Sequence, residues 1–455
     1  MRARARPRLH RRPRRRFPPL SRASARAARA ATLIAFSFPS SPSFPRLSSR
    51  SAPQILEHLN RGLAFTPSDC RWVPVSPRFV VVGTHARGTG AVVVHSMGAG
   101  EVRAVAELER PSGVKCATFG AALLEERNVA VGDYGGNVTI LDLERGGAAA
   151  RAAGAGAGPS RGGGASTSGG GADIFGAQGV GQGAGGAAPV GAGHVAWTAR
   201  AHASLVNCID GCGGLSIGGG APELATGSRD GAVKVWDPRI AEPVVAFEPG
   251  EGAAGRDCWS VAFGNAFNDE ERCLAAGYDN GDVKVFDLRM NAVRWETNVG
   301  NGVCTVEFDR KDIEMNKLVA ASLESRFKVF DCRTQHPVEG FAGVAEKVRA
   351  ARGARRGARA VLRPPVRSLT LSPVSPALSQ AHKATVWLAR HLPQNRDVWM
   401  TSGGNGGINL YRYNYPPKGR VERDADGRPR GVAGKVELVN ARILSTQPFV
   451  GWDWS

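Results

Sequence analysis

Four side chains near the middle of the sequence combine a histidine, a hydroxyl, a carboxylate and an indole: His202, Thr226, Asp230 and Trp236. With Ser228 close by, a histidine, a serine and an acid could form the triad of a hydrolase. However, no Gly-x-Ser-x-Gly motif surrounds Ser228, and similar residue sets recur in degraded form elsewhere in the chain. We therefore expect a buried hydrogen-bonded network that stiffens one structural unit, with Thr226 or Ser228 as its hydroxyl.

Cysteines form the second group that could do chemistry, as metal ligands or redox centres. Five of the eight occur in similar short apolar segments, and we assign them to one position of a repeat: Cys70, Cys116, Cys208, Cys258 and Cys304. Each belongs to a different segment, and the sequence has no Cys-x-x-Cys or His-x-x-x-His spacing. We therefore expect small buried thiols in a reducing compartment, with no bound metal and no cofactor.

Other motifs of enzymes are also missing from the sequence. It contains neither the phosphate-binding pattern Gly-x-x-x-x-Gly-Lys-Ser/Thr nor the zinc-binding pattern His-Glu-x-x-His. We predict that the chain is not an enzyme and that its loops serve to hold other proteins.

Short strands joined by tight turns position all of these residues. In Thr226–Asp237 (TGSRDGAVKVWD), Asp230 and Gly231 supply the positive-φ turn between two strands of alternating apolar residues. The same pattern recurs, with variations, at residues 132–142, 277–287, 322–331 and 403–411.

The spacing of these hairpins predicts the architecture. The aspartates that end three of them, Asp237, Asp287 and Asp331, are 50 and 44 residues apart. A single hairpin cannot bury its apolar face, and repeats of about 40–50 residues are typical of four-stranded blades arranged around an axis. The sequence therefore predicts an all-β WD-repeat β-propeller over residues 51–455.

Positive charge is concentrated in two segments outside the repeats. Residues 1–50 contain 14 arginines, residues 349–380 contain 7, and neither segment contains an acidic residue. These 21 arginines account for the formal net charge of +19, because the remaining 38 basic residues face 40 acidic ones. The repeats therefore do not suggest binding to nucleic acid or to a membrane, although the basic composition keeps an RNA- or membrane-associated protein as an alternative.

Three segments lack the apolar periodicity of the repeats. We interpret residues 1–50 as a disordered Arg-rich leader, with an organelle transit peptide as the alternative. Residues 146–193, with 19 glycines in 48 residues, are expected to be a disordered insertion in the second blade, before an outer strand at Val195–Thr198. Residues 349–380, rich in Arg and Pro, are expected to be an insertion, with a basic docking arm as the alternative.

Several longer segments are not typical of WD repeats in general. They include FDRKDIEMNKLVA (residues 308–320), HLPQNRDVWMTSGGNGG (391–407), GVAGKVELVN (431–440) and LSTQPFVGWDWS (444–455). Together with the repeats, they resemble Monad, the WD-repeat dynein axonemal assembly factor family. The resemblance covers residues 54–455 apart from the two internal insertions.

This resemblance implies a seven-bladed, non-enzymatic adaptor that acts in the cytoplasm during preassembly of axonemal dynein arms for cilia. The implied partners are dynein arm subunits and a prefoldin-like co-chaperone assembly with the reptin and pontin ATPases, and a role in apoptosis is also proposed for the family. We expect a monomer. The repeats alone would also fit a generic WD-repeat adaptor, such as a ubiquitin-ligase substrate receptor, and the leader would fit an organelle-targeted scaffold.

The resemblance also implies how the ring closes. The stretch Gln54–Leu59 would supply the outer strand of the seventh blade, and Phe449–Trp454 would supply its inner strand. We expect these two segments to pair and the last blade to be incomplete, with two of its four strands, because no further hairpin pattern follows.

The candidate partner-binding surface is one rim of the predicted disc, where the chain enters the inner strands and turns between the next two. Charged and aromatic side chains at such positions suit partner recognition, although solvated turn residues are the alternative. The candidates are Asp69, Lys115, Asn207, Asp257, Thr385, Tyr134, Arg229 and Tyr278.

Overall fold

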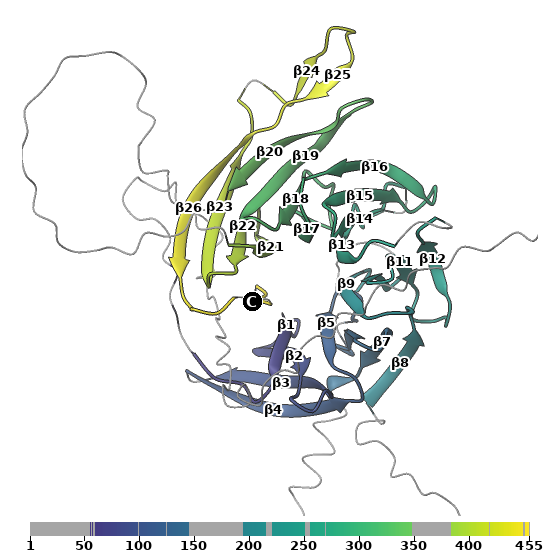
Figure 1. Cartoon of the computed structure of the whole chain (residues 1–455), viewed down its shortest axis with the longest axis vertical. Coiled ribbons are helices and arrows are strands. Elements are labelled where there is room, and N and C mark those ends of the chain that lie inside the picture. The colour runs from purple at the N-terminus through teal and green to yellow at the C-terminus, as the bar shows by residue number, and fades with distance from the viewer. Residues whose placement is uncertain are drawn as a thin grey trace, which may run out of the picture.

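Six antiparallel sheets of four strands each are arranged around a common centre in the computed structural model (Figure 1). The structure describes residues 55, 57, 60–98, 100–123, 125–144, 194–214, 221–250, 255–268, 270–347, 384–417, 419–448 and 451–454. The segments 1–50, 146–193 and 349–380, for which the sequence predicts disorder or insertions, lie outside these residues. Within the described part of the chain, no helix is long and apolar enough to cross a membrane.

The first three blades follow one another along the chain, each beginning with the strand nearest the centre. Blade 1 contains β1 (Thr66–Trp72), β2 (Arg78–Thr84), β3 (Gly90–Gly98) and β4 (Glu101–Arg110). Blade 2 contains β5 (Val114–Thr118), β6 (Val129–Asp133), β7 (Asn137–Leu141) and β8 (Val195–Arg200). Blade 3 contains β9 (Val206–Cys212), β10 (Glu223–Ser228), β11 (Val233–Trp236) and β12 (Pro243–Phe247). The strand predicted at Val195–Thr198 is thus β8, which pairs with β7 although residues 142–194 separate the two strands.

The remaining blades repeat this order. Blade 4 contains β13 (Cys258–Gly264), β14 (Cys273–Tyr278), β15 (Asp282–Asp287) and β16 (Ala292–Asn298). Blade 5 contains β17 (Val303–Phe308), β18 (Lys317–Ser322), β19 (Arg326–His336) and β20 (Gly340–Lys347). Blade 6 contains β21 (Val386–Leu392), β22 (Asn395–Gly403), β23 (Gly407–Asn414) and β26 (Lys435–Ile443). Between its last two strands, the small hairpin of β24 (Val421–Arg423) and β25 (Pro429–Gly431) projects outward (Figure 1).

The number of blades differs from the expected seven. The described residues supply the hairpins of six four-stranded blades, and Figure 1 shows the C-terminal segment between β21 and β1 without a strand arrow. Of the two segments expected to pair there, Ile55 and Gly451–Trp454 are described, and none of these residues is in a strand. Their apolar side chains instead pack on blade 6, beside residues such as Met400 and Leu410. A hydrogen bond of 3.2 Å from the Trp72 backbone N–H to the Asp453 carboxylate ties this segment to blade 1.

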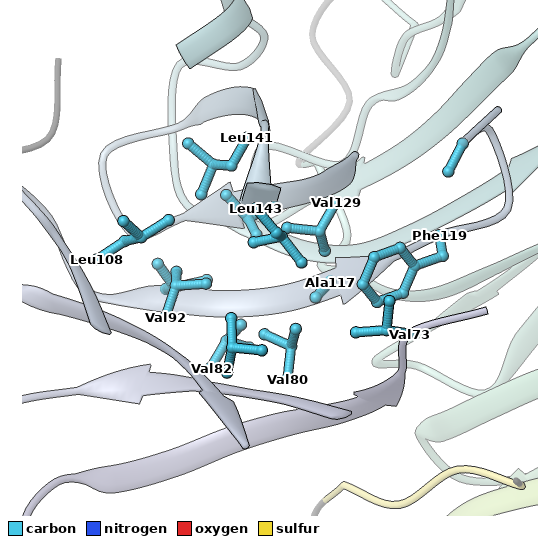
Figure 2. Packing of buried hydrophobic residues seen from close by; sticks show 14 residues of the cluster. Val73, Val80, Val82, Val92, Leu108, Ala117, Phe119, Val129, Leu141 and Leu143 are labelled. Atoms are coloured by element: carbon cyan, nitrogen blue, oxygen red, sulfur yellow. The ribbon is translucent and has the colours of Figure 1, made fainter. Parts of the chain in front are cut away.

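Apolar residues hold neighbouring blades face to face. Side chains alternate across a strand, so Val80 and Val82 of β2 face blade 2 while Val81 faces the opposite side. Figure 2 shows Val80 and Val82 directed toward Val129 and Leu141 of blade 2. Because both faces of the second strand of a blade are covered in this way, strands such as β2 and β14 are almost continuously apolar.

The predicted hairpin turns are present. Gly231 in the turn between β10 and β11 has a φ of 86°, and Gly281 in the corresponding turn of blade 4 has a φ of 92°. An L-residue side chain rarely adopts these angles, which explains why a glycine ends the Asp-Gly and Asn-Gly patterns.

Every inner strand contains a β-bulge near its start. In each of the six, one residue has no partner in the pairing with the second strand of the blade. These bulge residues are Ser68, Lys115, Asn207, Trp259, Cys304 and Trp387, and all six are half-buried. An extra residue in a strand redirects its side chain away from the regular alternation, so each blade presents one such side chain at the same level.

The five cysteines of the inner strands stand at different positions relative to the bulges. Cys304 is itself a bulge residue, Cys258 precedes a bulge, Cys116 and Cys208 follow one directly, and Cys70 lies one residue further along. The expectation that they share one repeat position was therefore wrong, because they stand at four different distances from a bulge that every inner strand has. All eight cysteines are free and are buried or half-buried.

Candidate protein-interaction surface

The four residues of the histidine network lie together in blade 3. The Thr226 hydroxyl lies 2.8 Å from His202 Nε2 and accepts a hydrogen bond of 2.9 Å from Trp236 Nε1. The other histidine nitrogen, Nδ1, lies 3.2 Å from Asp230 Oδ2. The network therefore connects the approach to β9 with β10, β11 and the turn between them.

Ser228 does not occupy the position of a nucleophile. Its hydroxyl accepts a 3.2 Å hydrogen bond from the Asp230 backbone N–H, and the residue has 0% exposure. The His202 nitrogens face Thr226 and Asp230 instead. Thr226 is thus the hydroxyl of the network, and Ser228 is out of reach of a substrate.

Asp230 carries the negative charge of this network. Burial acts to raise the pKa of its carboxyl, but hydrogen bonds from His202 and from the backbone N–H groups of Ala232 and Ala203 hold that pKa at about 2. The carboxylate is therefore ionised at neutral pH, and it fixes the turn against the chain that leads into β9.

Four of the predicted partner-binding residues reach the rim at the start of the inner strands. Tyr134 is 46% exposed, Arg229 is exposed, and Asp257 and Thr385 are half-buried. Arg229 Nε lies 3.7 Å from Asp257 Oδ2, so an ion pair spans the junction between blades 3 and 4. Backbone hydrogen bonds such as Tyr134 N to Gly113 O, at 2.9 Å, hold the hairpin turns of blades 2 to 6 beside the entries to their inner strands.

Two of the predicted surface residues are buried instead. The Asp69 carboxylate accepts hydrogen bonds from Arg71 Nε at 3.1 Å and from the Ala117 backbone N–H at 3.2 Å, which ties blade 1 to blade 2. Tyr278 packs in the apolar cluster between blades 3 and 4, beside Cys258. Sequence position alone did not reveal these contacts, because both depend on the neighbouring blade.

The last two predicted residues, Lys115 and Asn207, are bulge residues and line a central cavity of about 480 Å³. The inner strands of all six blades contribute to the lining of this cavity. Asn207 is held there by a hydrogen bond of 3.0 Å from its Nδ2 to the Cys258 carbonyl. The structure therefore divides the predicted surface into an outer rim and a central cavity.

The sequence analysis did not predict four further residues that line this cavity: Ser68, Trp259, Cys304 and Trp387. They are the bulge residues of the other four blades. The prediction placed Asp257 and Thr385 at the corresponding positions, two residues too early in each case. An alignment that sets Val114, Cys258 and Val386 at one position would have placed Trp259 and Trp387 at the position of Lys115.

Within the described ranges, no three His, Cys, Asp or Glu side chains come together as metal ligands. Tryptophan, tyrosine and arginine, which the rim and the cavity present, are the residue types enriched where proteins bind one another.

Comparison with known proteins supports the repeat pattern and the longer segments. The family model "WD domain, G-beta repeat" matches residues 193–237, which include the histidine network. Over 407 residues the chain is 47% identical to dynein axonemal assembly factor 10 of Chlamydomonas reinhardtii, covering 89% of this chain and 92% of the relative. The Xenopus laevis protein of the same name is 46% identical over 404 residues, with 89% and 90% covered, and the Homo sapiens protein is 44% identical over 410 residues, with 90% and 92% covered. With identity of this level along nearly the whole of each relative, the chain belongs to the dynein axonemal assembly factor 10 family.

Proposed function

We propose that this protein is a non-enzymatic scaffold that helps assemble axonemal dyneins before they enter the cilium. The observation that carries the proposal is the similarity to dynein axonemal assembly factors over about nine-tenths of the chain. The rigid ring of blades, with an exposed rim and a cavity at its centre, is a surface suited to holding another protein.

Assembly takes place in the cytoplasm, the protein acts as a monomer, and its partners are dynein arm subunits and a prefoldin-like co-chaperone assembly with reptin and pontin. The outer rim, with Tyr134 and the Arg229–Asp257 pair, is the proposed contact surface for these partners.

Affinity purification from cells that are building cilia tests this function. We expect dynein arm subunits and the co-chaperone assembly to co-purify with the tagged protein. Recovery of ubiquitin-ligase subunits without dynein would favour a substrate receptor, and enrichment in an organelle would favour the imported scaffold.

Two matched variants of blade 3 test the rim. Arg229→Glu reverses a charge at the rim, whereas Arg239→Glu reverses an exposed charge beyond the opposite end of β11. Partners should be lost from the first variant and retained by the second, while both keep the wild-type melting temperature. Equal recovery of partners by the two variants would reject the rim as the contact surface.

A further inference from the structure

The central cavity has the size and composition of a binding site. Its volume of about 480 Å³ lies within the range of small-ligand and side-chain pockets. Each blade contributes its bulge residue, so the lining combines two indoles, an ammonium, an amide, a hydroxyl and a thiol. Bulges that recur at one position of all six blades redirect these side chains together, which regular strands would not do.

Each of the two tryptophan rings lies against a glycine: Trp259 against Gly302 of the next blade, and Trp387 against Gly404 of its own blade. A Cβ atom added at Gly302 would lie 2.7 Å from the Trp259 ring, and one added at Gly404 would lie 3.4 Å from Trp387 Nε1. Glycine at position 302 therefore leaves room for the Trp259 indole, whereas the distance at Gly404 is an ordinary van der Waals contact. Both rings are half-buried, and each keeps an accessible part that a ligand can contact.

Most charges in the cavity are paired. Arg71 lies 3.0 Å from Asp69, and Lys311 forms an ion pair with Asp210. Arg390 lies 3.5 Å from Asp453. Lys115 has no ion-pair partner among the residues that the structure describes.

The Glu307 carboxyl does not neutralise the positive charge of Lys115. Burial raises the pKa of its carboxyl to about 8, although Arg390 and Lys311 act to lower it, so at neutral pH the group is mainly uncharged. Within the described chain its Oε2 has no hydrogen-bond partner, and Oε1 accepts only a 3.4 Å bond from the His391 backbone. The cavity lining therefore combines one uncompensated positive charge with two indoles, each from a different blade.

We propose that this cavity binds a short acidic peptide segment of a partner protein, with a carboxylate at Lys115 and an apolar side chain against Trp259 and Trp387. An ammonium attracts a carboxylate more strongly in a partly buried site than in water, and the indoles supply apolar contact area. The proposal rests on the scaffold function and gives the chemistry of the segment that the scaffold holds.

Binding of fluorescein-labelled hexapeptide pools, measured by fluorescence anisotropy, tests the cavity. Every peptide contains one Phe and one Leu. The peptides of the acidic pool also contain two acidic residues, those of the amide pool two amide residues, and those of the basic pool two basic residues. We expect the acidic pool to bind most tightly. Lys115→Met should weaken the binding of the acidic pool by about tenfold, as expected for loss of one charge-assisted contact. Trp387→Leu should weaken the binding of all three pools, because it removes an indole that each peptide contacts.

Lys284→Met is the matched control, because Lys284 is a half-exposed lysine on β15 outside the cavity. It should bind the acidic pool as the wild type does, and all variants should keep the wild-type melting temperature. Tightest binding of the basic pool, an unchanged affinity in Lys115→Met, or no binding of any pool would overturn the proposal. Peptide binding without dynein in the affinity purification would instead reject the proposed function and leave the cavity site standing.

Discussion

At the scale of single residues, the Asp230 carboxylate shows how one charged group can stiffen a blade. It receives bonds from His202 and from two backbone N–H groups, and its pKa is held at about 2. The usual pKa of an aspartate is about 3.9, so the folded protein favours the ionised form. A depressed pKa contributes stability above about pH 4 that is lost as the pH falls toward 2.

Asp230→Ala should lower the free energy of unfolding by about 1–3 kcal/mol at pH 7, because it leaves buried hydrogen-bond donors without an acceptor. The difference from the wild type should shrink between pH 4 and pH 3. Urea denaturation at pH 7, 4 and 3 measures both effects. Asp237→Ala is the control, since Asp237 pairs with an exposed arginine and should cost less than about 1 kcal/mol. Equal effects of the two variants would contradict the structural role of the network.

At the scale of elements, blades 5 and 6 are joined by a fully buried lysine. Lys317 on β18 lies 3.2 Å from Asp309, 2.8 Å from Asp397 and 2.6 Å from the Tyr415 hydroxyl. Burial alone would lower the pKa of Lys317, but the two carboxylates raise it, so the ammonium stays charged. Arg396 also contacts Asp309, at 2.8 Å, and completes the network.

Lys317→Met should lower the free energy of unfolding by about 3 kcal/mol, near the lower end for a broken buried ion pair because Arg396 still compensates Asp309. Chemical denaturation of the variant, compared with Lys284→Met, measures this cost. Lys284 is partly exposed, and its pair with Glu296 should contribute less than about 1 kcal/mol. A cost no greater than that of the control would show that the blades do not depend on this lysine.

The elements also show what the sequence could predict. Hairpins follow from Asp-Gly and Asn-Gly turns between apolar strands, and the structure contains them. The burial of Asp69 and Lys317 could not be predicted, because each has a partner in another blade far away in the chain, Ala117 and Asp397 respectively. The bulges were missed because each lies at the second or third residue of its strand, so too few residues precede it to show a break in the alternation, and the cavity tryptophans were missed with them.

At the scale of the whole molecule, the ring joins distant parts of the chain. Ile55 packs in the same apolar cluster as Trp452 and Trp454, and the Trp72 backbone bonds to Asp453. The family resemblance led to an expected seventh blade at this junction, but a blade requires hairpins, and the described residues there form none.

The pairing of β8 with β7 across residues 142–194 has a consequence for the order of folding. Its counterpart in blade 3, β12, begins after residues 237–242 only, and the two outer strands have the same alternation of half-buried and exposed residues. The sequence predicts a flexible chain for residues 146–193, and closing a flexible connection of this length costs about 2 kcal/mol more chain entropy. We therefore expect β8 to join its blade late during folding and to detach first.

In native-state hydrogen exchange, the amides of β8 should be protected about 30-fold less than those of β12. Equal protection of the two strands would mean that the long connection is not a free chain.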